Sequence, residues 1–209
     1  MKTWIRAASV TLRELLREAL EGDVDLDAFF SPAQGGTMVV TLDTPEEMVD
    51  LGREGVSLWL YRLQRDGETL NQPPRRVAPG ELRPRPLPLR LHYLVTPIVD
   101  HATRPQAPEL EQHVLGKVLQ VLHDVGSLRG ALLRDDLVGQ AMEIFVRLEP
   151  LTLEEITRVW DALELPYQLC VSYEVSVVPI HSGRAVEDTE PVDAVHADYG
   201  LATPLEGAP

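Results

Sequence analysis

The 209-residue sequence contains one cysteine, and this scarcity limits the structures it can form. A single thiol cannot make an internal disulfide, and it argues against a cysteine-based metal site. Cys170 lies among the apolar residues of a predicted strand, where free cysteines are usually buried and inert. We therefore expect a small packed side chain at this position, with a reactive thiol as the alternative.

Basic residues are also scarce, because 19 Lys and Arg stand against 33 Asp and Glu, for a net charge of -14. Phosphate binding needs clustered cations, so this balance disfavours nucleic acid as a partner. No run approaches the roughly 20 apolar residues that span a bilayer, so we expect no direct membrane insertion. The first 20 residues are cut by charges such as Arg6, Arg13 and Glu14, unlike a signal peptide. The sequence thus predicts a protein that is cytoplasmic when synthesised.

The motifs of common enzyme classes are absent as well. The sequence has no glycine-rich phosphate loop, no G-x-S-x-G elbow and no H-E-x-x-H pair. His113 and His123 are ten residues apart on a predicted helix, about 15 Å by rise per residue, so they cannot share a metal ion. Adjacent carboxylates point to different sides of an element and make poor acid/base couples: Glu46 and Glu47, Asp135 and Asp136, Glu154 and Glu155. We predict that the protein is not an enzyme and has no catalytic residue, cofactor or metal site.

Three segments carry the pattern of principal strands. In residues 87–98 the apolar Leu89, Leu91, Tyr93 and Val95 alternate with polar residues, which is typical of a strand with one face on a core. Residues 167–178 alternate in the same way, with a small polar opposite face that is either solvated or pressed against another molecule. Residues 56–63 are apolar on both faces, as expected near the middle of a covered sheet.

Helical periodicity predicts amphipathic helices over residues 3–20, 109–125 and 153–163. Thr11 to Glu14 forms a possible capping box that would start the first helix later, and Thr152 to Glu155 caps the last. Trp160 is the expected core anchor of that last helix. Shorter segments predict a turn of helix at 46–51, strands at 37–42 and 141–148, and a short edge strand at 24–30. The fold class is α+β (mixed α/β), a single domain whose mostly antiparallel or mixed β-sheet is flanked by about three amphipathic helices.

We expect the domain to span residues 1–180, followed by an acidic, proline-containing tail, 181–209, that is extended or disordered because it has too few large apolar residues to fold alone. Charge is segregated between this tail and the proline-rich segment 71–86, in which the prolines argue against a helix or an inner strand. That segment is either a plain solvated connection or a contact surface. The basic residues in this segment and just after it are Arg75, Arg76, Arg83, Arg85 and Arg90. The acidic residues of the tail nearest the domain are Glu187, Asp188 and Glu190.

Taken together, several segments resemble one known family. The run Leu-His-Tyr-Leu-Val-Thr-Pro at 91–97 and the segment from Trp160 to Tyr173 are the most specific, and the segments at 56–63, 111–116 and 119–124 agree in order and spacing. The sequence resembles the cap, or tail-terminator, proteins of extracellular contractile injection systems, which are phage-tail-like particles of the antifeeding-prophage type. The resemblance covers roughly residues 4–180 and does not extend into the tail.

The resemblance implies a structural assembly protein at the distal end of such a particle. It implies a homo-oligomeric ring, sixfold by analogy, that binds the last layer of inner tube and contractile sheath and ends both polymers. The particle into which the protein is incorporated is expected to be either released from the cell or anchored to it. The alternative is an adaptor or scaffold module that binds another component of a similar particle, with an enzyme of unrecognised type as a third option. A head-to-tail ring needs two complementary patches, which the basic segment and the acidic tail supply. Arg90 and His92 are added as expected partner-interface residues.

Overall fold

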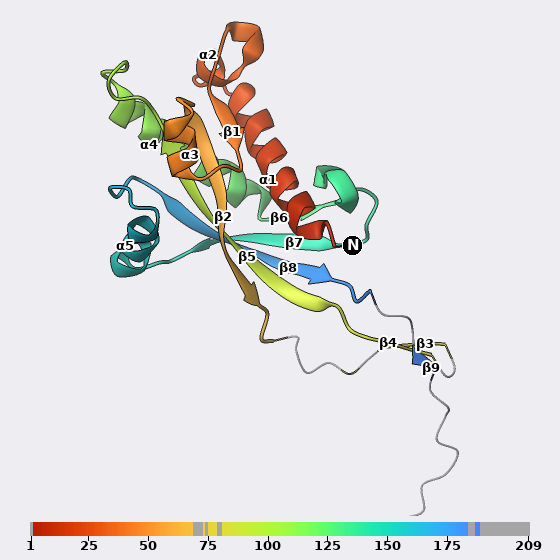
Figure 1. The fold of residues 1–209 in the computed structure, drawn as a ribbon. Helices are drawn as coiled ribbons and strands as arrows, with labels where there is room; N and C mark the ends of the chain where they lie inside the picture. Colours follow the sequence, from red (N-terminus) through yellow and green to blue (C-terminus); the bar gives the residue numbers. More distant parts are fainter. Residues whose placement is uncertain (1, 69–72, 74, 79–80, 184–186, 189–209) are drawn as a thin grey trace, which may run out of the picture. The chain divides into compact units, whose positions relative to one another are not determined.

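The computed structural model describes residues 2–68, 73, 75–78, 81–183 and 187–188 (Figure 1). By their contacts the residues form two units: residues 1–71 with 86–182, and residues 72–85 with 183–209. Residues 72–85, which the predicted domain 1–180 includes, belong to the second unit, and the boundary at residue 180 stays a prediction. No helix among the described residues has the length and apolar character needed to cross a membrane.

The first unit is built on a six-stranded sheet in the order β1-β2-β5-β8-β7-β6. Its strands are β1 (Val39–Thr41), β2 (Gly55–Arg65), β5 (Leu87–Ile98), β6 (Ser127–Arg129), β7 (Glu143–Glu149) and β8 (Val171–Ile180). β1 and β2 run parallel and every other neighbouring pair is antiparallel. The three strands predicted as principal are therefore adjacent, and the mixed α+β fold is confirmed.

β5 is central because both of its faces are buried, each by a different layer. Its residues Leu91, Tyr93 and Val95 point into the main core, where they pack under α1 (Trp4–Glu21) and α4 (Ala107–Val125). On the opposite face, Leu94 packs beneath Trp160 of α5 (Leu153–Ala162) in a second, smaller cluster. The sheet is thus covered by helices on two sides (Figure 1).

The helices follow the predicted patterns closely. α1 ends at Gly22 as expected, but the alternative start at Thr11 is wrong, because the Thr11 hydroxyl lies inside the helix and donates to the Ala7 carbonyl at 2.7 Å. α5 has the predicted capping box between Thr152 and Glu155. A second box, at Thr44 and Glu47, caps α3 (Pro45–Asp50), the predicted turn of helix.

Residues 24–30 do not form the predicted edge strand. They turn and enter a one-turn helix, α2 (Asp27–Phe30), followed by a 3-10 turn, η1 (Pro32–Gln34). Leu26 and Phe30 are buried in the main core. Side chains four residues apart lie on one side of a helix and also on one face of a strand, so their spacing could not distinguish the two structures. Two further 3-10 turns, η2 (Gly130–Leu132) and η3 (Asp135–Leu137), follow β6.

Gly55 shows why the parallel pair at the sheet edge can form. It has a φ of +133°, and a Cβ atom at this position would overlap the backbone of Val39. Only glycine adopts this conformation readily and also leaves room for the neighbouring strand. The close approach of β1 to β2 therefore depends on a residue without a side chain.

β8 departs from the predicted strand in two ways. It starts at Val171, so Tyr167 and Leu169 are left outside it, half exposed. Between Val175 and Val178 it carries one extra residue relative to β5. This bulge reverses the alternation, so Val178 is buried in the core, where the sequence pattern predicts Val177.

The small polar face of the predicted strand 167–178, expected to be solvated or pressed against another molecule, is largely covered by residues of this chain. Cys170, Ser172 and Ser176 are buried. The Trp160 indole N–H donates to the Cys170 sulfur at 3.3 Å, and burial raises the pKa of that thiol. Trp160 is confirmed as the anchor of its helix, and Cys170 as a packed side chain.

The second unit contains a three-stranded sheet in the order β3-β4-β9. Its strands are β3 (Arg75–Ala78), β4 (Glu81–Arg83) and β9 (Glu187–Asp188). The expectation that segment 71–86 cannot hold an inner strand is wrong, because β4 is paired on both sides. The prolines at 73, 74, 79, 84 and 86 all fall outside β3 and β4, so they remove no ladder donor.

Candidate interaction surfaces

The basic segment and the acidic tail meet within the second unit. Glu81 and Leu82 of β4 pair with Asp188 and Glu187 of β9 in an antiparallel ladder. Arg75 and Arg85 are exposed, and the Arg85 Nε donates to the Pro73 carbonyl at 2.9 Å. Of Arg76, Arg83, Glu187 and Asp188 only the backbone is described, and Glu190 lies outside the described residues. The sequence predicts charge attraction between these segments of neighbouring subunits; the backbone pairing seen here joins them within one chain, and their contact between subunits stays a prediction.

Arg90 lies on β5, where carboxylates of its own chain hold it. Its guanidinium contacts Asp66 at 2.6 Å and Glu174 at 3.2 Å, and the Asp66 side chain is only 2% exposed. The hydrogen bonds that Arg90 donates to these two carboxylates raise its pKa, so the group stays charged. A quarter of the Arg90 side chain remains exposed, which is the part available to a partner.

His92 lies two residues further along β5, at the centre of a polar cluster with Tyr61, Glu149 and Ser172. Its Nδ1 is 3.0 Å from the Glu149 carboxylate, which also accepts from the Ser172 hydroxyl at 2.8 Å. Tyr61 and Ser172 share a hydrogen bond of 3.0 Å. Burial acts to raise the pKa of Glu149, but the hydrogen bonds from His92 and Ser172 outweigh it and the pKa is lowered.

This arrangement does not form a nucleophilic triad. The Ser172 hydroxyl bonds to the carboxylate and not to the imidazole, so the serine–histidine contact of a triad is missing. The His92 side chain is 2% exposed, and its Nε2 is one of two buried polar atoms without a hydrogen-bond partner among the described residues. The cluster therefore ties β5, β7 and β8 together beneath the surface, and its use by a partner stays a prediction.

The two ends of the six-stranded sheet leave open edges beside grooves. At one end, β1 pairs only with β2 among the described strands, and a groove of 350 Å³ runs between it and α1. At the other end, β6 covers only residues Glu143 to Phe145 of β7. The rest of β7 borders a groove of 640 Å³ under α4. A sequence pattern indicates that a strand exists but not which strands pair with it, so neither open edge was predicted.

A further apolar surface surrounds the end of β5. Val49 of α3 and Tyr167 before β8 are each 50% exposed, and Leu169 is 39% exposed. These side chains and Val99 border a hollow of 390 Å³ beside the His101–Glu111 pair, whose atoms are 2.8 Å apart. The predicted strand 167–178 would have placed Tyr167 and Leu169 on the core face of the sheet, so this surface was not predicted.

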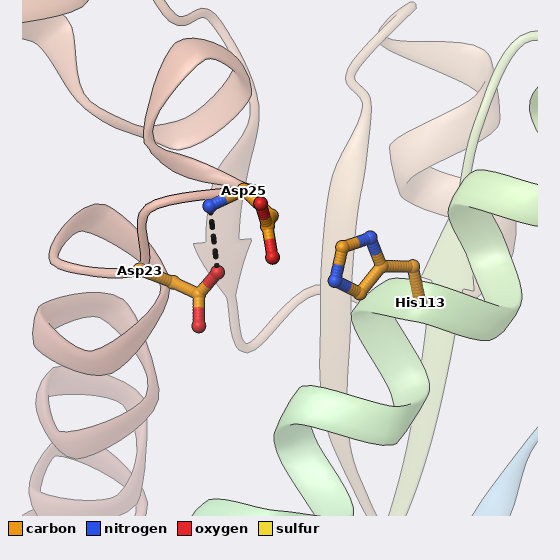
Figure 2. Close-up of side chains that lie close together, drawn as sticks. All are labelled: Asp23, Asp25 and His113. Atoms are coloured by element: carbon orange, nitrogen blue, oxygen red, sulfur yellow. Dashed lines mark hydrogen bonds between the residues drawn. The ribbon is translucent and has the colours of Figure 1, made fainter.

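One group of described residues has metal-ligand types close together, at the junction of α1 and α4 (Figure 2). The nearest ligand atoms of Asp23, Asp25 and His113 lie within 4.8 Å of one another. Asp23 is already engaged, because its Oδ1 accepts from the Asp25 amide at 3.0 Å and its Oδ2 pairs with Lys117 at 2.8 Å. The Lys117 hydrogen bond lowers the pKa of Asp23. These contacts explain the group as a link between two helices.

The chain was also compared with known proteins. A family model described as the Pvc16 N-terminal domain matches residues 7–194. A sequence search of curated proteins finds no match.

Two solved structures share the fold. One is the sheath/tube terminator of PVC, an extracellular contractile injection system, in its extended state: 18% identity, a TM-score of 0.58, and coverage of 97% of this chain and 65% of that chain. The other is the cap of the anti-feeding prophage, described as a tube-terminating cap: 18% identity, a TM-score of 0.54, and coverage of 92% and 62%. The chain thus spans less than two thirds of either solved chain.

Proposed function

The chain belongs to the Pvc16 N-terminal domain family, and we propose that it caps the distal end of a contractile, phage-tail-like injection particle. In this role it binds the last layer of inner tube and sheath and ends the growth of both polymers. The observation that carries the proposal is the likeness of nearly the whole chain to a sheath/tube terminator. The anti-feeding prophage cap supports it independently.

The proposed cap is a homo-oligomeric ring, a hexamer by the family resemblance. A heterologous ring needs two different surfaces on each subunit, and the charge segregation of this chain provides a basic and an acidic one. We assign the basic surface to Arg75, Arg76, Arg83 and Arg85, and the acidic one to Glu187, Asp188 and Glu190. Within one chain β4 pairs with β9, and this affinity between the two segments supports the assignment.

Salt dependence tests the charge assignment. Replacing Arg75 and Arg85 with Glu should weaken ring formation and reduce its sensitivity to salt, since exposed charge pairs are screened over about 10 Å at 0.1 M. The matched control replaces Arg53 and Arg158 with Glu, which changes the net charge equally at two exposed positions elsewhere. Equal effects of the two double variants would exclude the basic surface as a specific contact.

We assign contact with the terminal sheath subunit to the outer edge of β1, where an extended arm is added to the sheet. The Val39 amide donates to Glu54 on the β2 side, so the backbone of Val40 faces outward. The bordering groove is lined by Phe30, Met38 and the charged face of α1. A particle map that shows only side-chain contacts at this junction would contradict the assignment.

The location of the chain in assembled particles tests the cap role. A tagged chain should label one end of each particle, opposite the baseplate, at a fixed number of copies. Labelling along the sheath, or at the baseplate, would favour the alternative of an adaptor that binds another component. Absence of the label from purified particles would contradict both roles.

A further inference from the structure

The unpaired half of β7 is a place where another strand can be added. β6 ends its pairing at Phe145, and the Val146 amide donates to the Gly126 carbonyl at 3.0 Å, away from β8. Leu148 is two residues further on, so its backbone N–H and C=O point to the same outer edge. Among the described strands, none lies beside it there.

The groove next to this edge is apolar at its base. Leu119 and Leu122 of α4, Val146 and Leu148 of β7, and Tyr173 of β8 line it. Leu148 is 55% exposed although it points to the same face as the buried Val146. The lining includes Arg147 and His123 but no carboxylate, which is unusual on a chain with a net charge of -14. The site therefore fits an extended segment with apolar side chains on one face and acidic charge.

The sequence contains such a segment outside the described residues. Residues 192–203 lie between Pro191 and Pro204 and are free of proline. Within them Val195, Ala197, Tyr199 and Leu201 alternate with smaller or polar residues, the pattern of a strand with one apolar face. Residues 189–209 carry four carboxylates and no Lys or Arg. Their charge thus complements that of Arg147.

We propose that the open edge of β7 and its groove bind residues 192–201 of a second copy of this chain. The proposal rests on the proposed ring and gives it a defined contact, because each copy then donates one segment and accepts another. Successive donation of this kind is head-to-tail and closes a ring without a symmetric interface. The β1 edge suits this segment less well, because Glu14 and Glu21 line its groove and its arginines are already paired with them.

Cysteine cross-linking between separately made full-length variants tests the contact and its direction. Leu148→Cys is mixed with Ala197→Cys, Asp198→Cys or Tyr199→Cys under mild oxidation. We expect disulfide-linked dimers with positions 197 and 199, which face the groove, and at least about fivefold fewer with 198, because strand residues alternate in direction. Val138→Cys replaces Leu148→Cys as the control, since Val138 is 62% exposed in the same unit. The native Cys170 is buried and leaves this background low.

Equal yields at 197, 198 and 199, or with the Val138→Cys control, would overturn the proposal. Cross-linking only within a chain that carries both Leu148→Cys and Tyr199→Cys would overturn the second copy as occupant. Capture of a sheath or tube subunit by Leu148→Cys in particles, with none between copies, would do the same. If the tagged chain labels the particle end but no such cross-link forms, this inference alone is refuted. If the cross-linked ring forms but is absent from particles, the proposed cap is refuted.

Discussion

Cys170 should report directly on how firmly α5 is held against the sheet. As the only cysteine, it gives a single labelling signal, and it lies 7% exposed under the Trp160 ring. Burial raises the pKa of the thiol, which lowers the fraction of reactive thiolate at neutral pH. The native protein should therefore react slowly with a thiol reagent.

Replacing Trp160 with Ala should both destabilise the fold and expose the thiol. The side chain is 1% exposed and packs on Leu94, Leu163 and Cys170, and truncation of a buried Trp costs about 3–5 kcal/mol. Part of that packing is to Leu163, which directly follows the last residue of α5 and therefore belongs to the same segment as Trp160. If about 1.4–2.8 kcal/mol of this loss weakens the docking of α5 on the sheet, the rate of thiol labelling should rise roughly 10- to 100-fold.

The matched control is Trp4→Ala on the other face of the sheet. Trp4 is 6% exposed in the main core, so its loss should cost a similar amount in urea unfolding but leave the labelling rate of folded protein within about twofold. Trp160→Phe should lie between wild type and Trp160→Ala. Equal labelling rates in the two Ala variants, or no acceleration in Trp160→Ala, would refute the assignment of α5 as a separately docked cover.

Four further perturbations test individual contacts. Tyr93→Phe removes the buried 2.7 Å hydrogen bond between Tyr93 and Ser9 that joins β5 to α1, and should cost about 1 kcal/mol of unfolding free energy in urea. A double-mutant cycle with Ser9→Ala that shows no coupling would exclude the bond as a stabilising contact. Arg90→Met removes the hydrogen-bonded ion pair with Asp66 and should cost about 2 kcal/mol, with less lost in Arg90→Lys. Equal stability of wild type and Arg90→Met would count against the pair. Hydrogen bonds from Arg104 lower the pKa of Glu54 below its ordinary 4.5, so its contribution to stability is present above pH 4.5 and lost as the pH falls further; Glu54→Gln should flatten the decline of unfolding free energy below pH 4.5, and an unchanged slope would contradict the pairing. Thr152→Ala should cost about 1 kcal/mol of unfolding free energy through loss of the cap of α5. Thermal unfolding measures it, with Thr157→Ala inside the same helix as the control. A larger loss of stability in Thr157→Ala would show that capping is not the cause.

The strands and helices could be predicted where the signal is local. Alternation in β5 and 3.6-residue periodicity in α1 and α4 follow from burial of one face, so they are visible in the sequence itself. The capping box at Thr152 is equally local, since its two hydrogen bonds join residues three apart. These features place the three principal strands and the helices that cover them.

What sequence reasoning missed depends on contacts between distant residues. The bulge in β8 is set by its register against β5, so nothing near Val177 reveals it. Pairing of Arg90 with Asp66 and of His92 with Glu149 joins residues 24 and 57 positions apart. Pairing of β4 with β9 joins segments about 100 residues apart, and their opposite charges were the only sequence signal of it.

The candidate surfaces were predicted in part for the same reason. Charge segregation identified the segments that hold Arg75, Arg85, Glu187 and Asp188, whereas their partner-interface role is still a prediction. The open half of β7 was not predicted, because it follows from the shortness of β6, which is a property of pairing and not of composition. A period-2 pattern shows that a strand exists but carries no information about which edge is left uncovered.

The length distribution of particles assembled without this chain tests the central claim most directly. If the chain ends polymerisation, electron microscopy should show tubes and sheaths of broad, uncontrolled length, and re-expression of the chain should restore a single length. Tyr93→Phe, a mild variant within the fold, should also restore it. Particles of normal, uniform length in the absence of the chain would contradict the proposed cap.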